Sequence, residues 1–183
     1  LSKHHYFFAV KLPIEVKAFL QEWVEAKKQD FPFAKWVHHE DYHITLAFLG
    51  FAAEEMKYEA IQTIDEVLKD EHPFPLTLHQ IGIFGPHKKP RIFWAGVEHS
   101  NELIHLQKKV YNHLLKVGFE LDKKPFRPHI TLARKWNSPE EFDQNLLTAI
   151  ENNLSFTVNE IILYETHLDQ TPKYHEFARF LLE

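Results

Sequence analysis

The chain has 183 residues, of which 44% are hydrophobic and 14% aromatic, enough to fill the core of a domain that folds alone. Its 21 Lys and Arg are outnumbered by 26 Asp and Glu, and the net charge of -5 argues against a protein that wraps long nucleic acid. The absence of cysteine excludes disulfides, thiolate metal sites and thiol nucleophiles.

No apolar run approaches the roughly 18 to 20 residues that a membrane-spanning helix needs, and no segment has the long apolar centre of a signal peptide. We therefore expect a cytoplasmic protein. No linker-like or low-complexity stretch divides the chain, so residues 1–183 are expected to form a single domain.

The first half of the sequence predicts strand, helix, strand, helix. Aromatic and β-branched residues mark strands over 6–12 and 42–49, and Gly50 closes the second of them. Apolar residues at helical spacing mark helices over 14–28 and 54–69.

The second half predicts more strands than helices. Two strands over 74–84 and 91–97 are joined by a turn-rich basic connection, a helix follows over 102–116, and a further strand covers 125–134. The N-cap serine, proline and glutamates at 138–141 predict a helix that runs to about 151. The last two strands, 156–167 and 174–182, form a closing hairpin. Hairpin connections favour an α+β fold with antiparallel or mixed sheets over a doubly wound parallel sheet.

The pentapeptide His-Ile-Thr-Leu-Ala occurs twice, at 43–47 and at 129–133, each time on a predicted strand in its own half. This repeat predicts two pseudo-symmetric, intertwined lobes, each with a sheet and with helices on its outer face, around a shared cleft. Because side chains alternate along a strand, the histidine and threonine of each copy share one face, opposite the isoleucine and leucine. We expect the polar pairs to converge on the cleft: His43 and Thr45 from one copy, His129 and Thr131 from the other.

Two imidazoles and two hydroxyls suit attack of water on a phosphorus atom. A neutral histidine can take a proton from water while a protonated one donates to the leaving oxygen, and the threonine hydroxyls can bind the non-bridging oxygens. This chemistry requires no metal. A strand that merely packs alike in both lobes would explain the repeated isoleucine and leucine, but not the repeated histidine and threonine.

At these residues the sequence resembles the 2H phosphoesterase superfamily, and within it the RNA 2',3'-cyclic phosphodiesterases, also called 2'-5' RNA ligases. The resemblance spans nearly the whole chain. Its strongest stretches are 6–10 (YFFAV), 43–50 (HITLAFLG), 91–97 (RIFWAGV) and 126–134 (FRPHITLAR).

The resemblance implies a bilobal α+β fold and hydrolysis of a terminal RNA 2',3'-cyclic phosphate to a 2'-phosphate, without a metal or another cofactor. It makes His43 the proton donor and His129 the acceptor, with Thr45 and Thr131 as phosphate ligands. The partners it implies are RNA ends or small nucleotides that carry a cyclic phosphate, bound by a monomer with no obligate protein partner. Ligation of RNA ends would be a side activity, because the 5'-hydroxyl of a second RNA can replace water as the nucleophile that attacks the cyclic phosphate.

Two further residues are candidates for substrate binding. Arg134 matches the family arginine after the second motif, but strict alternation places it on the face of Ile130 and Leu132, so it needs a β-bulge or the end of the strand to reach the site. Phe48 can stack on a base or ribose, although the same alternation predicts that it packs in the core. The basic turn around Lys88, Lys89 and Arg91 can guide RNA or simply be solvated. Family members often carry an arginine before the first strand, where this chain has His4 and His5.

Two other classes of function compete with this interpretation. The histidines and carboxylates between 38 and 43 offer ligands for a zinc-dependent hydrolase, although their spacing matches no familiar site. A non-catalytic module that binds nucleotides or RNA ends in the same cleft is the other alternative. Survival of the activity in EDTA and the behaviour of histidine variants distinguish the metal-independent phosphodiesterase, the zinc hydrolase and the binding module.

Overall fold

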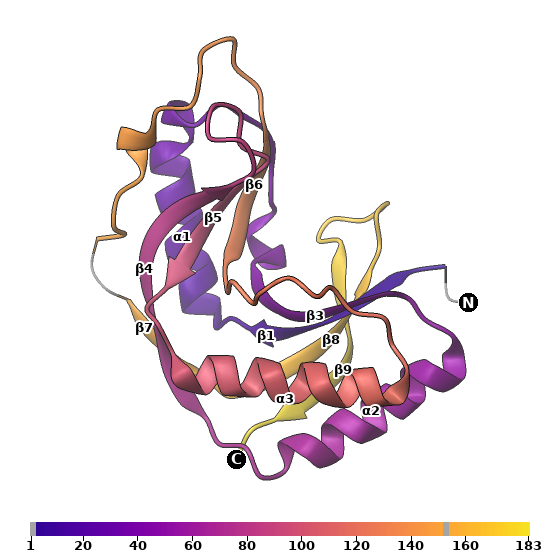
Figure 1. Ribbon diagram of the computed structural model, residues 1–183. Coiled ribbons are helices and arrows are strands. Elements are labelled where there is room, and N and C mark those ends of the chain that lie inside the picture. The colour runs from indigo at the N-terminus through magenta and orange to yellow at the C-terminus, as the bar shows by residue number, and fades with distance from the viewer. Residues whose placement is uncertain (1–2, 152–153) are drawn as a thin grey trace.

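The computed structural model describes residues 3–151 and 154–183 and has an α+β fold (Figure 1). Three short 3₁₀ turns accompany its helices and strands, whose bounds are β1 (His5–Lys11), α1 (Ile14–Lys27), β2 (Phe33–Trp36), β3 (His43–Phe51), α2 (Glu54–Leu68), β4 (Phe74–Phe84), β5 (Ile92–Val97), α3 (Asn101–Val117), β6 (Ile130–Trp136), β7 (Ser155–Val158), β8 (Glu160–Thr166) and β9 (Tyr174–Leu181). None of the helices in these described ranges is long and apolar enough to cross a bilayer.

The strands form one path in the order β7-β4-β5-β6-β3-β1-β8-β9, with β2 beside β6. Every strand pairing in the described chain is antiparallel, which confirms the predicted fold class. The sequence suggested a sheet in each lobe. In the structure the two halves of the sheet are continuous, and β3 and β6 join them through a single residue pair, Ile44 and Ile130.

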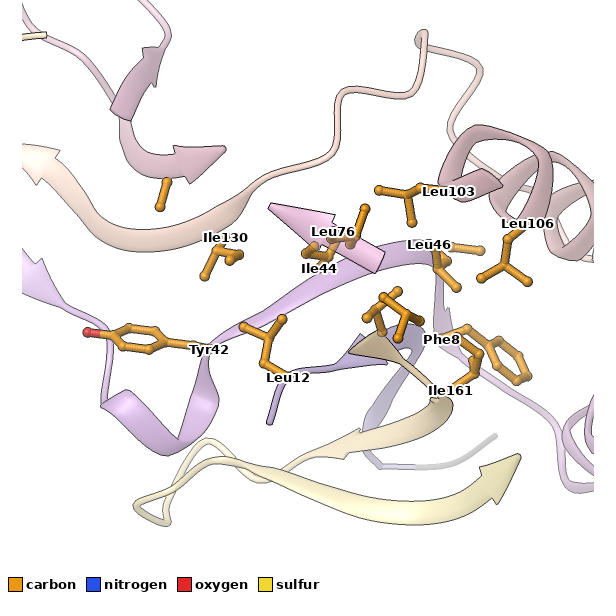
Figure 2. Packing of buried hydrophobic residues seen from close by; sticks show 14 of the residues in the cluster. Phe8, Leu12, Tyr42, Ile44, Leu46, Leu76, Leu103, Leu106, Ile130 and Ile161 are labelled. Carbon is orange, nitrogen blue, oxygen red and sulfur yellow. The ribbon is translucent and has the colours of Figure 1, made fainter. Parts of the chain in front are cut away.

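The helices cover different halves of this sheet (Figure 1). The Trp23 ring of α1 lies 6.2 Å from the Phe93 ring of β5, whereas α2 and α3 pack together near β3 and β9. Figure 2 shows Leu103 and Leu106 of α3 close to buried side chains of β3, among them Ile44 and Leu46. The core thus includes Ile44, the β3 residue through which the two pentapeptides meet.

The helix predicted over 139–151 is wrong. The Ser138 hydroxyl accepts the N–H of Glu140 at 3.1 Å, but the chain then runs irregularly to a 3₁₀ turn at Gln144–Leu146. The Phe142 N–H donates to the Lys88 carbonyl at 2.9 Å. Further backbone bonds with β4 replace helical ones, as in the bridge between Gln80 and Ala149. The local capping signal was real, but neighbouring strands take up the backbone groups that a helix would have used.

Two strand predictions also change, and one strand was not predicted. The stretch predicted over 156–167 divides into β7, which pairs with β4, and β8, which pairs with β1 and β9. The strand predicted from 125 begins only at Ile130, because residues 119–129 have no regular structure. The unpredicted strand β2 is four residues long, too short to show an alternating pattern.

Candidate active site

The two pentapeptides lie side by side. Ile44 pairs with Ile130 in antiparallel register, and both side chains are completely buried. Counting outward from this pair puts His43 level with Thr131 and Thr45 level with His129. The two motifs are therefore related by a local two-fold axis, as the exact repeat suggested.

Each imidazole is oriented by a carbonyl two residues before it. His43 Nδ1 donates to the Asp41 carbonyl at 2.7 Å, and His129 Nδ1 donates to the Arg127 carbonyl at 2.7 Å. A carbonyl can only accept, so each Nδ1 carries the proton of the neutral ring and each Nε2 is left unprotonated. The Thr45 hydroxyl donates to His43 Nε2 at 3.0 Å. The two imidazole rings thus share one tautomer and the same kind of anchor.

Burial lowers the pKa of both histidines. The pKa of His43 falls to about 4, mainly through burial and further through the positive charges of His129, Lys17 and Arg134. The pKa of His129 falls for the same first reason, and Arg134 lowers it further. In the free protein at neutral pH both imidazoles are therefore neutral.

Aromatic rings account for the burial of His43. Its ring centroid lies 4.8 Å from that of Phe7, 5.1 Å from Tyr174 and 6.0 Å from Tyr164. His129 instead has the Phe84 ring edge-on at 4.8 Å. His43 thus lies in the more apolar surroundings of the two.

Strand alternation is interrupted at the same position in both motifs. Ala9 pairs with Thr45, but its neighbour Phe8 pairs with Ala47, so Leu46 is an extra residue of β3. Trp94 likewise pairs with Thr131 while Phe93 pairs with Ala133, which makes Leu132 an extra residue of β6. Each pentapeptide therefore carries a β-bulge at its leucine.

These bulges turn Phe48 and Arg134, each five residues after its motif histidine, toward the cleft face. Phe48 pairs with Phe7, whose ring contacts His43, and it is 51% exposed, so the prediction that it packs in the core is wrong. Arg134 pairs with Ile92, and Thr131 pairs with Trp94. Because Ile92 and Trp94 are two residues apart on β5, Arg134 and Thr131 lie on the same face of the sheet. The bulge that the sequence required for Arg134 is present.

A cleft of about 740 Å³ opens beside the two motifs. Thr45, Phe48 and His129 line it, whereas His43, Thr131 and Arg134 lie next to this lining rather than in it. The other lining residues come from β3, the β4–β5 hairpin, α3 and the segment before β6: Leu46, Ala47, Phe84, Gly85, Arg91, Ile92, Gln107, Tyr111, Leu121, Asp122, Lys124, Pro125, Phe126 and Arg127. Of the basic hairpin residues, Arg91 lines the cleft, whereas Lys88 pairs with Glu141 at 3.5 Å.

The charge of this cleft differs from that of the whole chain. Arg91, Lys124 and Arg127 line it against one acidic residue, Asp122, although the net charge of the protein is -5. The sequence had given no reason to select Lys124, Gln107 or Tyr111, because only the fold brings α3 and the segment before β6 to this place. Arg127 was within reach of prediction, since it belongs to the stretch FRPHITLAR.

The residues that could bind zinc lie apart from the two motif histidines. In the described ranges 3–151 and 154–183, potential ligand atoms gather in two groups: His38, His39 and Glu40, and His4, Glu165 and His167. Neither group includes His43 or His129. The Asp41 carboxylate instead accepts the backbone N–H groups of Lys173 and Tyr174, each at 3.1 Å.

Comparison with known proteins places the chain in a family. The family model of the 2'-5' RNA ligase superfamily matches residues 12–170. The chain belongs to this superfamily. The resemblance drawn from the two motifs is confirmed.

Two relatives illustrate the match. The chain is 40% identical over 183 residues to a Geobacillus stearothermophilus RNA 2',3'-cyclic phosphodiesterase, covering all of this chain but 58% of that protein. It is 33% identical over 181 residues to the Bacillus subtilis (strain 168) RNA 2',3'-cyclic phosphodiesterase, covering 97% of this chain and 96% of the relative. The chain thus spans little more than half of the first relative and nearly all of the second.

Solved structures agree in fold. E. coli LigT complexed with 3'-AMP matches with a TM-score of 0.83 and 25% identity, over 98% of both chains. TT0787 of Thermus thermophilus matches with a TM-score of 0.81 and 28% identity, over 97% of both chains.

Proposed function

We propose that this protein is an RNA 2',3'-cyclic phosphodiesterase, a hydrolase that opens the terminal cyclic phosphate of an RNA to a 2'-phosphate without a metal. The observation that carries the proposal is the antiparallel joint at Ile44 and Ile130, which aligns two histidines, each with Nδ1 held by a carbonyl and with an unprotonated Nε2. Homologues with this activity in their names support it.

In the proposed reaction, the water oxygen attacks phosphorus while His129 Nε2 takes its proton. The bond from phosphorus to the 3'-oxygen breaks, and His43 Nε2 donates a proton to that oxygen. The product carries a 2'-phosphate and a free 3'-hydroxyl. The order of the two histidines follows the family resemblance, because the geometry of the two motifs is nearly symmetric.

His43 must be protonated before it can donate. In the free protein its pKa is about 4, mainly because burial disfavours the imidazolium. An anionic cyclic phosphate beside the ring favours the charged form and raises that pKa. Binding of the substrate is therefore the event that supplies the acid, and an empty site keeps both imidazoles neutral.

The remaining site residues hold the substrate. Once His43 Nε2 is protonated, it no longer accepts from the Thr45 hydroxyl, and the hydroxyls of Thr45 and Thr131 donate hydrogen bonds to the non-bridging oxygens. The forked donors of Arg134 neutralise the charge that develops there. Phe48 stacks on the base or ribose of the terminal nucleotide. The cationic lining of the cleft in an acidic chain suits an RNA that is held only at its end. The proposed enzyme is a cytoplasmic monomer in which residues 1–183 form a single domain.

The test is to incubate the protein and EDTA with an oligonucleotide that ends in a 2',3'-cyclic phosphate and to identify the product. We expect a 2'-phosphate. His43→Gln and His129→Gln should each lower kcat by about 10²- to 10⁴-fold. His113→Gln is the matched control, because the His113 ring is also held by a carbonyl, that of Lys109 at 2.8 Å, but on α3.

Other results would point elsewhere. Loss of activity in EDTA would favour the zinc hydrolase. Binding of the oligonucleotide by the parent protein and both variants, without turnover by the parent, would favour the binding module. A 3'-phosphate would keep the histidine pair but mean that the 2'-oxygen leaves. Joined RNA ends in the presence of a 5'-hydroxyl oligonucleotide would reveal the ligation side activity.

A further inference from the structure

Three aromatic rings are linked by ring contacts at the end of β3 and the start of β1. The His5 ring lies edge-on to both phenylalanine rings, with centroids 5.4 Å from Phe48 and 4.1 Å from Phe51. Phe48 is 51% exposed and Phe51 54% exposed. We call His5, Phe48 and Phe51 the aromatic ledge.

Strand register explains why these rings share a face. His5 pairs with Phe51, and Phe7 pairs with Phe48. A second register shift, between Tyr6 and Phe7, brings positions 48 and 51 of β3 to the same side, and the bulge at Leu46 turns that side toward the cleft. Phe48 also lines the cleft, and Phe7 continues the row inward to His43, at 4.8 Å. The ledge is thus an outward continuation of the cleft wall.

We propose that the aromatic ledge stacks the base of the second nucleotide from the RNA end, so that the enzyme prefers oligonucleotides to mononucleotides with the same cyclic phosphate. This inference rests on the proposed function, in which Phe48 holds the terminal nucleotide. A neighbouring base joined by one phosphodiester then meets the next rings along the face, His5 and Phe51.

The chemistry of the surroundings selects a nucleobase over other occupants. Single exposed apolar side chains, such as Ile14 and Leu168, are ordinary on a protein surface. The ledge differs because its rings adjoin and because it continues a cleft lined by the cations Arg91, Lys124 and Arg127. Flat apolar rings beside cations are what single-stranded nucleic acid binds, with little dependence on sequence.

The test compares three substrates: a nucleoside 2',3'-cyclic phosphate, a dinucleotide that ends in the same group, and that dinucleotide with an abasic first residue. Stacking of a base on a protein ring corresponds to about a 5- to 100-fold effect on binding. The parent protein should therefore favour the intact dinucleotide over the other two by that factor in kcat/KM, through KM.

Variants locate this preference. Phe51→Ala should lower kcat/KM for the intact dinucleotide to the level of the abasic one and leave the mononucleotide unchanged, and Phe51→Trp should keep the preference. Tyr58→Ala is the matched control, because Tyr58 is an aromatic residue of α2 with a similar exposure, 52%. It should change none of the three values.

Each remaining outcome is informative. Equal kcat/KM for all three substrates in the parent protein would overturn the ledge and leave the proposed function intact. An equal loss on all substrates in Phe51→Ala would assign Phe51 to support of the fold and also overturn it. Absence of turnover for every substrate would instead overturn the proposed function.

Discussion

His43 is held in place largely through one neighbour. The Asp41 carbonyl accepts its Nδ1–H, while the buried Asp41 carboxylate accepts the N–H groups of Lys173 and Tyr174. Because the Tyr174 ring packs edge-on against the His43 ring, Asp41 fixes both the imidazole and the aromatic wall beside it. These surroundings orient the ring, but they also disfavour its charged form.

The burial of His43 should make the fold sensitive to acid. Its pKa falls from 6.5 in the unfolded chain to about 4 in the folded protein, so the unfolded chain binds the proton first. The stabilisation is fully present above pH 6.5 and is lost as the pH falls toward 4. At 1.36 kcal/mol per pKa unit, the free energy of unfolding should decrease by up to about 3 kcal/mol.

Urea unfolding at a series of pH values measures this loss, and His43→Gln should flatten the profile because glutamine does not titrate. The control is His99→Gln, which alters an exposed histidine next to α3 and should leave the slope unchanged. The same slope in the parent and in His43→Gln would mean that other groups, His129 first among them, carry the acid sensitivity.

At the scale of strands and helices, sequence patterns succeeded where the cause was local. The helices over 14–28, 54–69 and 102–116 end within one or two residues of α1, α2 and α3, because their apolar faces repeat at helical spacing. The central residues of the candidate site were also predictable, because the repeated pentapeptide identified its two histidines and two threonines.

The failures have causes outside the local sequence. A β-bulge depends on how two strands pair, so alternation assigned Phe48 and Arg134 to the wrong face, by one residue each. The helix expected over 139–151 is replaced by backbone bonds to β4 and to the hairpin after it. The cleft residues of α3 and of 119–129 become neighbours only through the complete fold.

Strand β4 carries a glycine whose role is to make room for a tryptophan. A Cβ atom at Gly82 would lie 2.1 Å from Cζ2 of Trp94, the residue with which Gly82 pairs. The indole therefore lies flat over the glycine. The Phe84 ring is 5.2 Å from Trp94 and 4.8 Å from His129, which links this packing to the candidate active site.

Gly82→Ala should destabilise the protein by about 1–3 kcal/mol, because the added methyl group overpacks the indole. It should also lower kcat/KM, since Phe84 shifts with Trp94. Denaturant unfolding and turnover of the cyclic-phosphate substrate measure the two effects. When Trp94 is first replaced by leucine, Gly82→Ala should lower the free energy of unfolding much less than it does in the parent protein. Additive losses in the double variant would mean that Gly82 matters for another reason, such as the conformation of its backbone.

Viewed as a whole, the molecule places a cationic cleft on an acidic protein. The net charge of -5 repels long RNA, whereas Arg91, Lys124 and Arg127 lie around the cleft that adjoins the two histidines. An RNA held only at its end should therefore release few counterions on binding. A protein that gripped an extended strand would release many more.

The salt dependence of binding tests this arrangement. Each phosphate contact with single-stranded RNA contributes about -0.7 to the slope of log K against log salt. With one to three contacts, an oligonucleotide that ends in a 2'-phosphate, the proposed product, should bind with a slope between about -0.7 and -2. Lys124→Gln should remove one phosphate contact and so reduce the magnitude of that slope by about 0.7. Lys116→Gln, at the exposed end of α3, should leave the slope unchanged. A steeper slope that both variants reduce equally would mean that RNA is bound over a wide surface, against the charge of the chain.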